Sequence, residues 1–242
     1  MKQVVIGDLH GHWIELQELM IKLMSKENIN PALDQFIFLG DYVDGGPDVK
    51  KIIDWLIQSK KDHPAWKFLY GNHEDLLLDA LNPERPIYNN FNLWWRQGGM
   101  ETTNSYLKDS NFSEYELSLA NPIHVIPKEH LEFLAGLDTY YETDKYFFVH
   151  GGVSKNHTIE WSKKHMSRYD MIWERDFITS DFAYEKKIIF GHTIQTGNNP
   201  AKFLQPWIYP NKIGIDTMAH NMGRLTALIL PEEKIVQTDF RE

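Results

Sequence analysis

A short apolar run that ends in a glycine and a polar residue occurs three times in the first third of the chain. The polar residues are Asp8, Asp41 and Asn72, which lie 33 (41 − 8) and 31 (72 − 41) positions apart. This spacing is close to the ~30 residues of one βαβ unit, and the intervals carry apolar residues at helical spacing. The pattern predicts an α/β fold in which these three residues meet at one edge of a parallel sheet.

Two further apolar runs, in the second half of the chain, end in histidine. Tyr146–Val149 precedes His150, and the run 188–190 comes shortly before His192. Between the two groups of runs, from about residue 83 to residue 144, the sequence is aromatic with helical spacing. We predict a single domain over residues 1–242 with a helical cap inserted at about 83–144.

The composition narrows the chemistry and the partners. The chain has no cysteine, which excludes disulfides, thiolate metal sites and cysteine nucleophiles. Its 25 Lys and Arg against 34 Asp and Glu give a net charge of −9, which disfavours general binding to nucleic acid. There is no signal-peptide pattern, and no apolar stretch is long enough for a membrane span. We therefore expect a cytoplasmic protein that does not bind membranes.

The strand ends bring nitrogen and oxygen donors together without sulfur. Ligands of α/β proteins bind at the carboxyl edge of the sheet, and imidazole with carboxylate and amide oxygen favours manganese, iron or zinc over magnesium or calcium alone. Six donors exceed the need of one catalytic ion, so we predict two ions that share a carboxylate, with Asp41 as the bridge. The alternative is a polar rim of turns that binds nothing. The predicted metal ligands are Asp8, His10, Asp41, Asn72, His150 and His192.

Five ordered motifs carry a resemblance to a known family. They are GDLHG (7–11), GDYVDGG (40–46), GNHE (71–74), HGG (150–152) and GHT (191–193). With these motifs the chain resembles the PPP-type metallophosphoesterases of the calcineurin-like phosphoesterase superfamily, in particular the bacterial and phage serine/threonine protein phosphatases. Weaker similarity, at 173–175 and 215–217 among other places, extends to dinucleoside polyphosphatases. The resemblance implies central mixed β-sheets flanked by helices, with the cap as an insertion.

The resemblance also implies a metal arrangement and a mechanism. Manganese is the first candidate for both ions, with iron and zinc as alternatives. A hydroxide that bridges the ions would attack phosphorus directly, His73 would protonate the leaving oxygen, and Asp44 would hold the His73 ring. The implied ligands are Asp8, His10 and Asp41 for the first ion, and Asp41, Asn72, His150 and His192 for the second.

One position departs from the family pattern. The second motif of the family usually ends in Asp-Arg-Gly, and its arginine grips the substrate phosphate through two parallel hydrogen bonds; this chain has Gly45 there. The resemblance places Asn72 and Arg175 at the substrate, and Arg175 is the candidate that compensates for the missing clamp. The alternative for Arg175 is an ion pair with Glu174 or Asp176. The glycine at position 45 leaves open which class of substrate the protein acts on, but it does not argue against hydrolysis of a phosphate ester.

Three functions compete at this point. The first is a phosphomonoesterase that acts on phosphoserine or phosphothreonine in proteins, and the second is a hydrolase of dinucleoside polyphosphates. Both act on a phosphorylated partner, a phosphoprotein or a nucleotide. Trp94 and Trp95 in the cap bear on the second function, because they either stack a nucleobase or belong to the core. The third is a scaffold without catalysis, which the complete set of motif residues disfavours.

Overall fold

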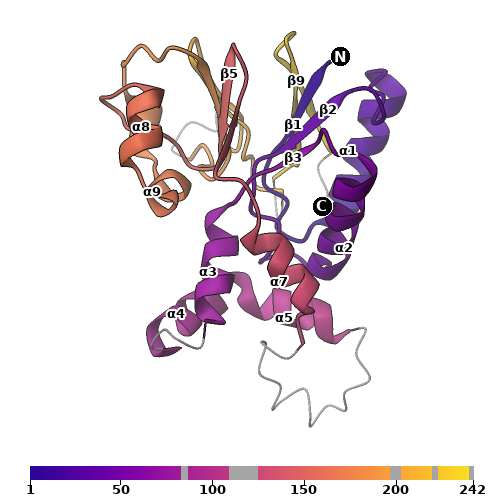
Figure 1. Cartoon of the computed structure of the whole chain (residues 1–242). Helices are drawn as coiled ribbons and strands as arrows, with labels where there is room; N and C mark the ends of the chain where they lie inside the picture. Colours follow the sequence, from indigo (N-terminus) through magenta and orange to yellow (C-terminus); the bar gives the residue numbers. More distant parts are fainter. Residues whose placement is uncertain (83–86, 109–124, 197–202, 220–222, 240–242) are drawn as a thin grey trace.

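Strands of the described residues form two mixed sheets (Figure 1). The structure is a computed structural model, and it describes residues 1–82, 87–108, 125–196, 203–219 and 223–239. In the first sheet β1, β2 and β3 run parallel, and β9 runs antiparallel to both β1 and β10. Its strands, in spatial order, are β10 (Lys234–Gln237), β9 (Thr226–Leu230), β1 (Gln3–Ile6), β2 (Gln35–Phe38) and β3 (Lys67–Phe68).

The second sheet has the same plan, with parallel strands in the middle and antiparallel strands at the edges. β5, β6 and β8 are parallel, whereas β4 and β7 pair antiparallel with β5 and β8. Its strands, in spatial order, are β4 (Tyr140–Glu142), β5 (Tyr146–Val149), β6 (Lys187–Phe190), β8 (Lys212–Gly214) and β7 (Trp207–Tyr209).

The predicted mixed sheets and α/β class are confirmed, with two differences of detail. Asp8, Asp41 and Asn72 follow the parallel strands β1, β2 and β3 at one sheet edge, as the spacing predicts, whereas the strands that precede His150 and His192 belong to the second sheet. The sequence analysis also did not predict β4, β7 and β10. These are short edge strands with mostly half-exposed residues, which carry a weaker sequence signal than buried strands.

The two sheets pack face to face, and helices cover their outer faces. Side chains alternate along β1, so that Val5 packs between the sheets with Phe148 and Ile189, whereas Val4 and Ile6 face the helices. In Figure 1, α1 (Trp13–Lys26) and α2 (Val49–Asp62) flank the first sheet, and α8 (Ile159–His165) and α9 (Arg168–Trp173) flank the second. The layer of α1 and α2 follows from the predicted periodicity, because Leu16, Leu19 and Leu23 of α1 and Ile52, Ile53 and Leu56 of α2 are buried.

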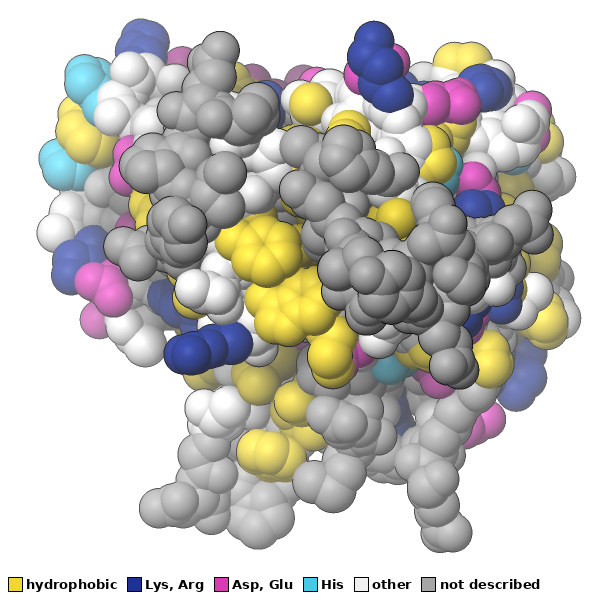
Figure 2. All heavy atoms as spheres, turned by 90° about the horizontal axis from the view of Figure 1, so that it is seen from below, with side chains coloured by type: hydrophobic (Ala, Val, Ile, Leu, Met, Phe, Trp, Pro, Cys, Tyr) yellow, Lys and Arg dark blue, Asp and Glu magenta, His cyan; other side chains and the backbone are white. Residues whose placement is uncertain are grey.

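A group of helices lies below the ends of the sheets in Figure 1. It consists of α3 (Asn72–Ala80), α4 (Ile87–Trp94), α5 (Met100–Leu107) and α7 (Lys128–Ala135), with a π-helical turn at Trp95–Gly99 between α4 and α5. We call α4, this turn and α5 the α4–α5 segment. Residues 83–86 and 109–124 of the predicted cap lie outside the described residues, so the boundaries 83–144 stay a prediction. Figure 2 views this face and shows hydrophobic side chains gathered near its centre.

Candidate metal centre

The candidate ligands stand on loops with an unusual backbone. Four of the site residues have positive φ: His10 (43°), Asp41 (51°), Asp44 (68°) and His192 (61°). A side chain in this left-handed region costs of order 1–3 kcal/mol, and such strain clusters at functional sites. The strand ends therefore turn sharply at the residues that the motifs single out.

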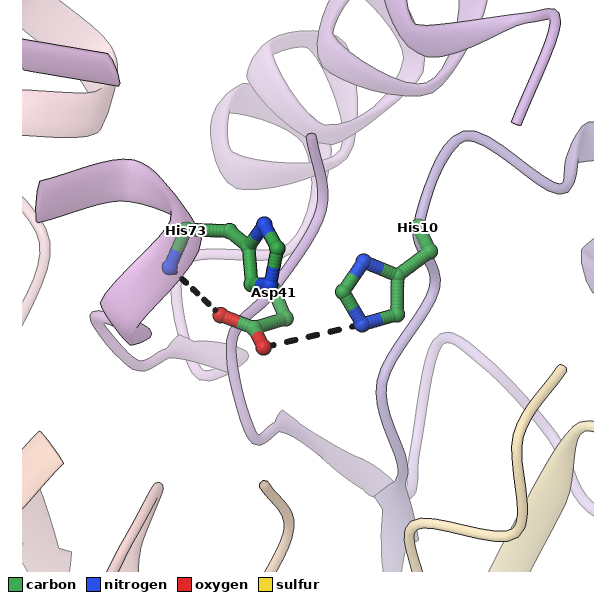
Figure 3. Close-up of side chains that lie close together, drawn as sticks. All are labelled: His10, Asp41 and His73. Atoms are coloured by element: carbon green, nitrogen blue, oxygen red, sulfur yellow. Dashed lines mark hydrogen bonds and ion pairs between the residues drawn. The ribbon is translucent and has the colours of Figure 1, made fainter. Parts of the chain in front are cut away.

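Asp41 lies at the centre of the site. Its Oδ1 accepts the backbone N–H of His73 at 2.9 Å and lies 3.3 Å from His150 Nε2. Its Oδ2 lies 3.6 Å from His10 Nε2, and Figure 3 shows His10 and His73 on either side of the carboxylate. Among the residues that the structure describes, two clusters have donor atoms within 4.8 Å of one another, and both include Asp41; they are His10, Asp41 and His73, and Asp41, His150 and His192.

The charges in this group depend strongly on one another. Burial disfavours charge on Asp41, but the nearby His150 and His73 outweigh it and hold the pKa of Asp41 well below its usual value. Burial also opposes charge on His150, yet Asp41 raises the pKa of His150 to about 10. In contrast, burial and the charge of His150 lower the pKa of His192 to about 2. The site thus keeps Asp41 as a carboxylate and His192 as a neutral ring, which are the forms that bind metal.

Asp8 supplies a buried oxygen without a partner. Its Oδ2 accepts the backbone N–H of His192 at 2.9 Å, whereas its Oδ1 has no hydrogen-bond partner among the described residues. Burial and the nearby Asp216 raise the pKa of Asp8 well above its usual value. A cation would relieve this crowding of carboxyl groups, so the donor set fits a divalent ion. Asp8 lies beside the two clusters of three and belongs to neither.

His150 and Asn72 join the two sheets at the site. His150 Nδ1 lies 2.9 Å from the carbonyl oxygen of Leu39, and its Nε2 lies 2.9 Å from Asn72 Oδ1. With Nδ1–H donated to a carbonyl, Nε2 is the nitrogen that faces the site, and an ion bound there would displace the proton that the raised pKa of His150 keeps on it. Because Leu39 directly follows β2 and His150 directly follows β5, this contact fixes the first sheet against the second.

Arg175 lies against a predicted metal ligand. Its Nε donates to His192 Nε2 at 2.9 Å, and no ion pair between Arg175 and Glu174 or Asp176 occurs in this described part of the chain. A neutral ring has one unprotonated nitrogen, and here Arg175 occupies it. An ion on His192 therefore uses Nε2 in place of the arginine, or uses Nδ1 and moves the proton to Nε2. In either case the guanidinium loses this acceptor.

His73 and Asp44 form the predicted pair. His73 Nδ1 lies 2.8 Å from Asp44 Oδ2, and the Asp44 side chain is fully buried. Burial opposes a charge on His73, but Asp41 and a hydrogen bond to Asp44 raise the pKa of His73 to about 9. His73 is therefore protonated at neutral pH. An imidazolium beside the bridging carboxylate candidate is suited to protonate a leaving group.

At the position of the missing arginine, the backbone conformation itself favours glycine. Gly45 adopts φ 88°, which side chains other than glycine rarely adopt. A Cβ at this position would meet no atom closer than 3.8 Å. The turn is therefore built for glycine by its backbone conformation, and not by a lack of space.

The sequence analysis did not assign a role to Glu74, which supports the site. Glu74 is fully buried, and its two oxygens accept the backbone N–H groups of Asp41, Tyr42, Val43 and Gly71 at 2.8–3.3 Å. Glu74 thereby fixes the loop that carries the central carboxylate. The signal for it was present, because Glu74 lies three positions after Gly71 at the start of α3, the spacing of a capping box.

Two tryptophans of the α4–α5 segment have different surroundings. Trp94 is completely buried, and its Nε1 donates to Asp44 at 2.9 Å. It therefore belongs to the core, and the idea that its ring stacks a nucleobase is wrong. Trp95 is 36% exposed and its ring stacks on Phe91 at 5.7 Å between centroids. Of the two, only Trp95 offers a ring surface to a ligand.

Comparisons with known proteins show what this chain is similar to. The model of the calcineurin-like phosphoesterase family matches residues 1–205. Serine/threonine-protein phosphatase 2 of Escherichia coli (strain K12) is 25% identical over 231 residues, which cover 92% of this chain and 89% of that protein. The bis(5'-nucleosyl)-tetraphosphatase PrpE (asymmetrical) of Oceanobacillus iheyensis is 27% identical over 262 residues, which cover 100% of this chain and 94% of that protein.

A solved structure supports the fold. The cold-active protein-tyrosine phosphatase of a psychrophilic Shewanella species has a TM-score of 0.60 at 16% identity, over 98% of this chain and 77% of that chain. At this identity the likeness concerns the fold alone. With the family match over most of the sequence, the chain belongs to the calcineurin-like phosphoesterase family and is a hydrolase of phosphoric esters.

Proposed function

We propose that the protein is a phosphomonoesterase with two divalent ions and that it acts on phosphoserine or phosphothreonine in proteins. The observation that carries this proposal is the position of His73. Its ring Nδ1 lies 2.8 Å from Asp44 Oδ2, and its backbone N–H donates to Asp41 Oδ1 at 2.9 Å. A proton donor thus stands directly beside the shared carboxylate of two donor clusters. The name of the Escherichia coli relative supports a protein substrate.

The ligands that we propose for the ions follow the geometry of the strand ends. The two donor clusters meet at Asp41, which supports a bridging role. Bound divalent ions would lower the pKa of water to supply the nucleophile and would neutralise charge on the phosphoryl oxygens. We propose manganese first, with iron and zinc as alternatives. Asp8, His10 and Asp41 would hold one ion, and Asp41, Asn72, His150 and His192 the other.

The chain's own groups then have distinct tasks. His73 donates a proton to the leaving oxygen, and Asp44 keeps the ring aimed and charged. Arg175, once its Nε no longer donates to His192, presents a guanidinium to the phosphate together with the Asn72 amide. Because the turn at Gly45 has no side chain, the phosphate is held by fewer charged hydrogen bonds than in relatives with the arginine clamp.

The second candidate is hydrolysis of dinucleoside polyphosphates. The relative from Oceanobacillus iheyensis bears that name and matches over the whole chain. The half-exposed ring of Trp95, stacked on Phe91, is the feature of the fold that favours a base. Bound metal chemistry would be the same for both candidates, so only the part that recognises the substrate differs.

Turnover of two substrates decides between the candidates. We would load the protein with manganese and compare kcat/KM for a phosphothreonine peptide with that for diadenosine tetraphosphate, whose products are measured after added phosphatase releases their phosphate. We expect the peptide to win by about tenfold or more, a difference of ~1.4 kcal/mol in the barrier. A dinucleotide preference of that size would replace the first candidate by the second. Equal inactivity on both would contradict the catalytic proposal.

The setting of the reaction remains an expectation from the sequence. We propose a cytoplasmic enzyme with a phosphorylated partner, without general nucleic-acid binding and without membrane attachment. In the ranges that the structure describes, no helix is both long enough and apolar enough to cross a bilayer. Fractionation of cells that express the full chain would test the location directly.

A further inference from the structure

Asp44 is held by more than His73. Its Oδ2 accepts from the His73 ring, whereas its Oδ1 lies 2.9 Å from Trp94 Nε1 and 2.7 Å from Thr102 Oγ1. Thr102 Oγ1 also accepts the backbone N–H of Asp44 at 2.9 Å. All of these groups except the His73 ring are fully buried. Water therefore cannot replace either donor if it is lost.

The direction of each hydrogen bond is fixed by chemistry. An indole N–H only donates. The Thr102 hydroxyl accepts the Asp44 amide, so its single proton points to Asp44 Oδ1. Two donors on one oxygen fix the plane of the carboxylate, and they leave the other oxygen aimed at His73 Nδ1. A carboxylate held only by His73 would be free to turn about its last torsion, because such sp³–sp² torsions have broad minima.

The backbone of the α4–α5 segment also lies close to the turn that contains Asp44. Gly98 has φ 108°, and a Cβ on it would lie 2.4 Å from Gly45 N and 3.0 Å from Asp44 Cβ. A Cβ on Gly99 would lie 2.5 Å from the Trp94 ring. The two glycines therefore allow the segment to approach the turn and let the indole lie beneath it.

We infer that Trp94 and Thr102 are positioning residues for the proton donor. Through Asp44 they hold the His73 ring in the orientation that reaches the leaving oxygen. This inference rests on the proposed function, because it assumes that His73 is the acid. It assigns to the α4–α5 segment a part in the chemistry, in addition to any part in substrate recognition.

The test compares two leaving groups in the manganese-loaded full chain. The leaving group of a phosphothreonine peptide is the threonine alkoxide, which must be protonated. The leaving group of p-nitrophenyl phosphate is p-nitrophenolate, which is stable without a proton. We expect Thr102→Val to lower kcat on the peptide by about 10- to 100-fold, less than the loss of the acid itself. On p-nitrophenyl phosphate we expect a change within about twofold, with KM for the peptide and metal content unchanged.

Two further variants serve as rescue and control. Thr102→Ser keeps the hydroxyl and should restore the peptide rate. Thr103→Val removes a neighbouring buried hydroxyl that donates to Gly99 O at 2.9 Å and does not contact Asp44, so it should leave both rates unchanged. The Nδ1 proton of His73 should give a downfield NMR signal in the wild type and in Thr102→Ser that broadens or shifts in Thr102→Val. A purely structural role for the hydroxyl would move neither the signal nor the ratio of the two rates.

The outcomes separate the inference from the proposed function. If His73→Ala slows both substrates equally, the acid assignment fails. If His73→Ala is selective for the peptide but folded Thr102→Val is not, the inference fails and the proposed function stands. Should Thr102→Val not fold, Trp94→Phe takes its place in the same two assays, since it removes the N–H and keeps an aromatic ring. Equal loss on both substrates in that variant would also overturn the inference.

Discussion

The groups proposed to bind metal and the groups proposed to supply the proton meet at Asp41, but they depend on different parts of the fold. The ligands stand at the ends of buried strands, and contacts between the sheets hold them, such as His150 on the carbonyl of Leu39. The proton donor is held through Asp44 by side chains of the α4–α5 segment. The comparison suggests that metal binding and proton transfer can be lost separately.

Removing the shared carboxylate should have the largest effect. Asp41→Asn takes away a charge that both donor clusters use. We expect loss of bound metal and a fall in kcat/KM of about 10³-fold or more, since metal ions supply several kcal/mol of transition-state stabilisation. Metal content by mass spectrometry and phosphate release check this. Full activity with unchanged metal content would contradict the bridging role of Asp41.

Removing the proposed acid, His73, should leave metal binding unchanged. We expect His73→Ala to keep its metal and to lower kcat for a phosphothreonine peptide by about 10²- to 10⁴-fold, the usual range for a positioned acid or base. The same two measurements apply. Loss of metal in this variant would break the comparison, because it would mean that His73 acts with the cluster of His10 and Asp41 as a ligand.

Removing the arginine should affect binding more than turnover. Arg175→Ala takes away a candidate for charged hydrogen bonds to phosphate, which are worth about 1.5–3 kcal/mol. We expect KM to rise by about 10- to 100-fold while kcat changes little. Steady-state kinetics with the preferred substrate decide this. Unchanged KM would assign Arg175 to holding His192 and not to the substrate.

The pH profile should show the proton donor by itself. The raised pKa of His73, about 9, means that the ring is protonated below that pH and loses its proton above it. Because ions bound to Asp41 would offset part of its effect on the ring, we expect kcat for an alkyl phosphate to fall about tenfold per pH unit on the alkaline side of a value at or below about 9. The same raised pKa stabilises the folded protein fully below the ordinary pKa of 6.5, and this contribution is lost as pH rises through about 9. A flat alkaline limb would contradict the acid role.

The smallest effect concerns the exposed ring of the α4–α5 segment. If the substrate is a phosphopeptide, Trp95→Ala should change kcat/KM for that peptide by less than about threefold, as for most surface substitutions. If the substrate is a dinucleotide, loss of a stacked base would cost about 1–3 kcal/mol in binding. Titration of diadenosine tetraphosphate into wild type and variant separates these cases.

The same division explains what the sequence could and could not predict. Asp8, Asp41 and Asn72 follow buried strands at regular spacing, so a local pattern was enough to predict their meeting, and the apolar runs before His150 and His192 added these two in the same way. Trp94 and Thr102 lie 50 and 58 positions from Asp44. Their partners are set by how the α4–α5 segment packs, and no local periodicity reports that. Asp216 lies in the weakly similar stretch 215–217, but its effect on Asp8 required the two sheets to be placed together.

The left-handed backbone of His10, Asp41, Asp44 and His192 bears on how such a protein responds to engineering. Glycine would relieve backbone strain of order 1–3 kcal/mol at each position, although at Asp44 it would also leave the buried Trp94 Nε1–H and the Thr102 hydroxyl without their acceptor. A selection for heat tolerance alone rewards glycine wherever the relief of strain exceeds the contacts that are lost. Each such gain would remove a group that we place in the chemistry. Thermostable variants of this protein are therefore better sought on the outer helices than at the strand ends, where stability and activity oppose each other.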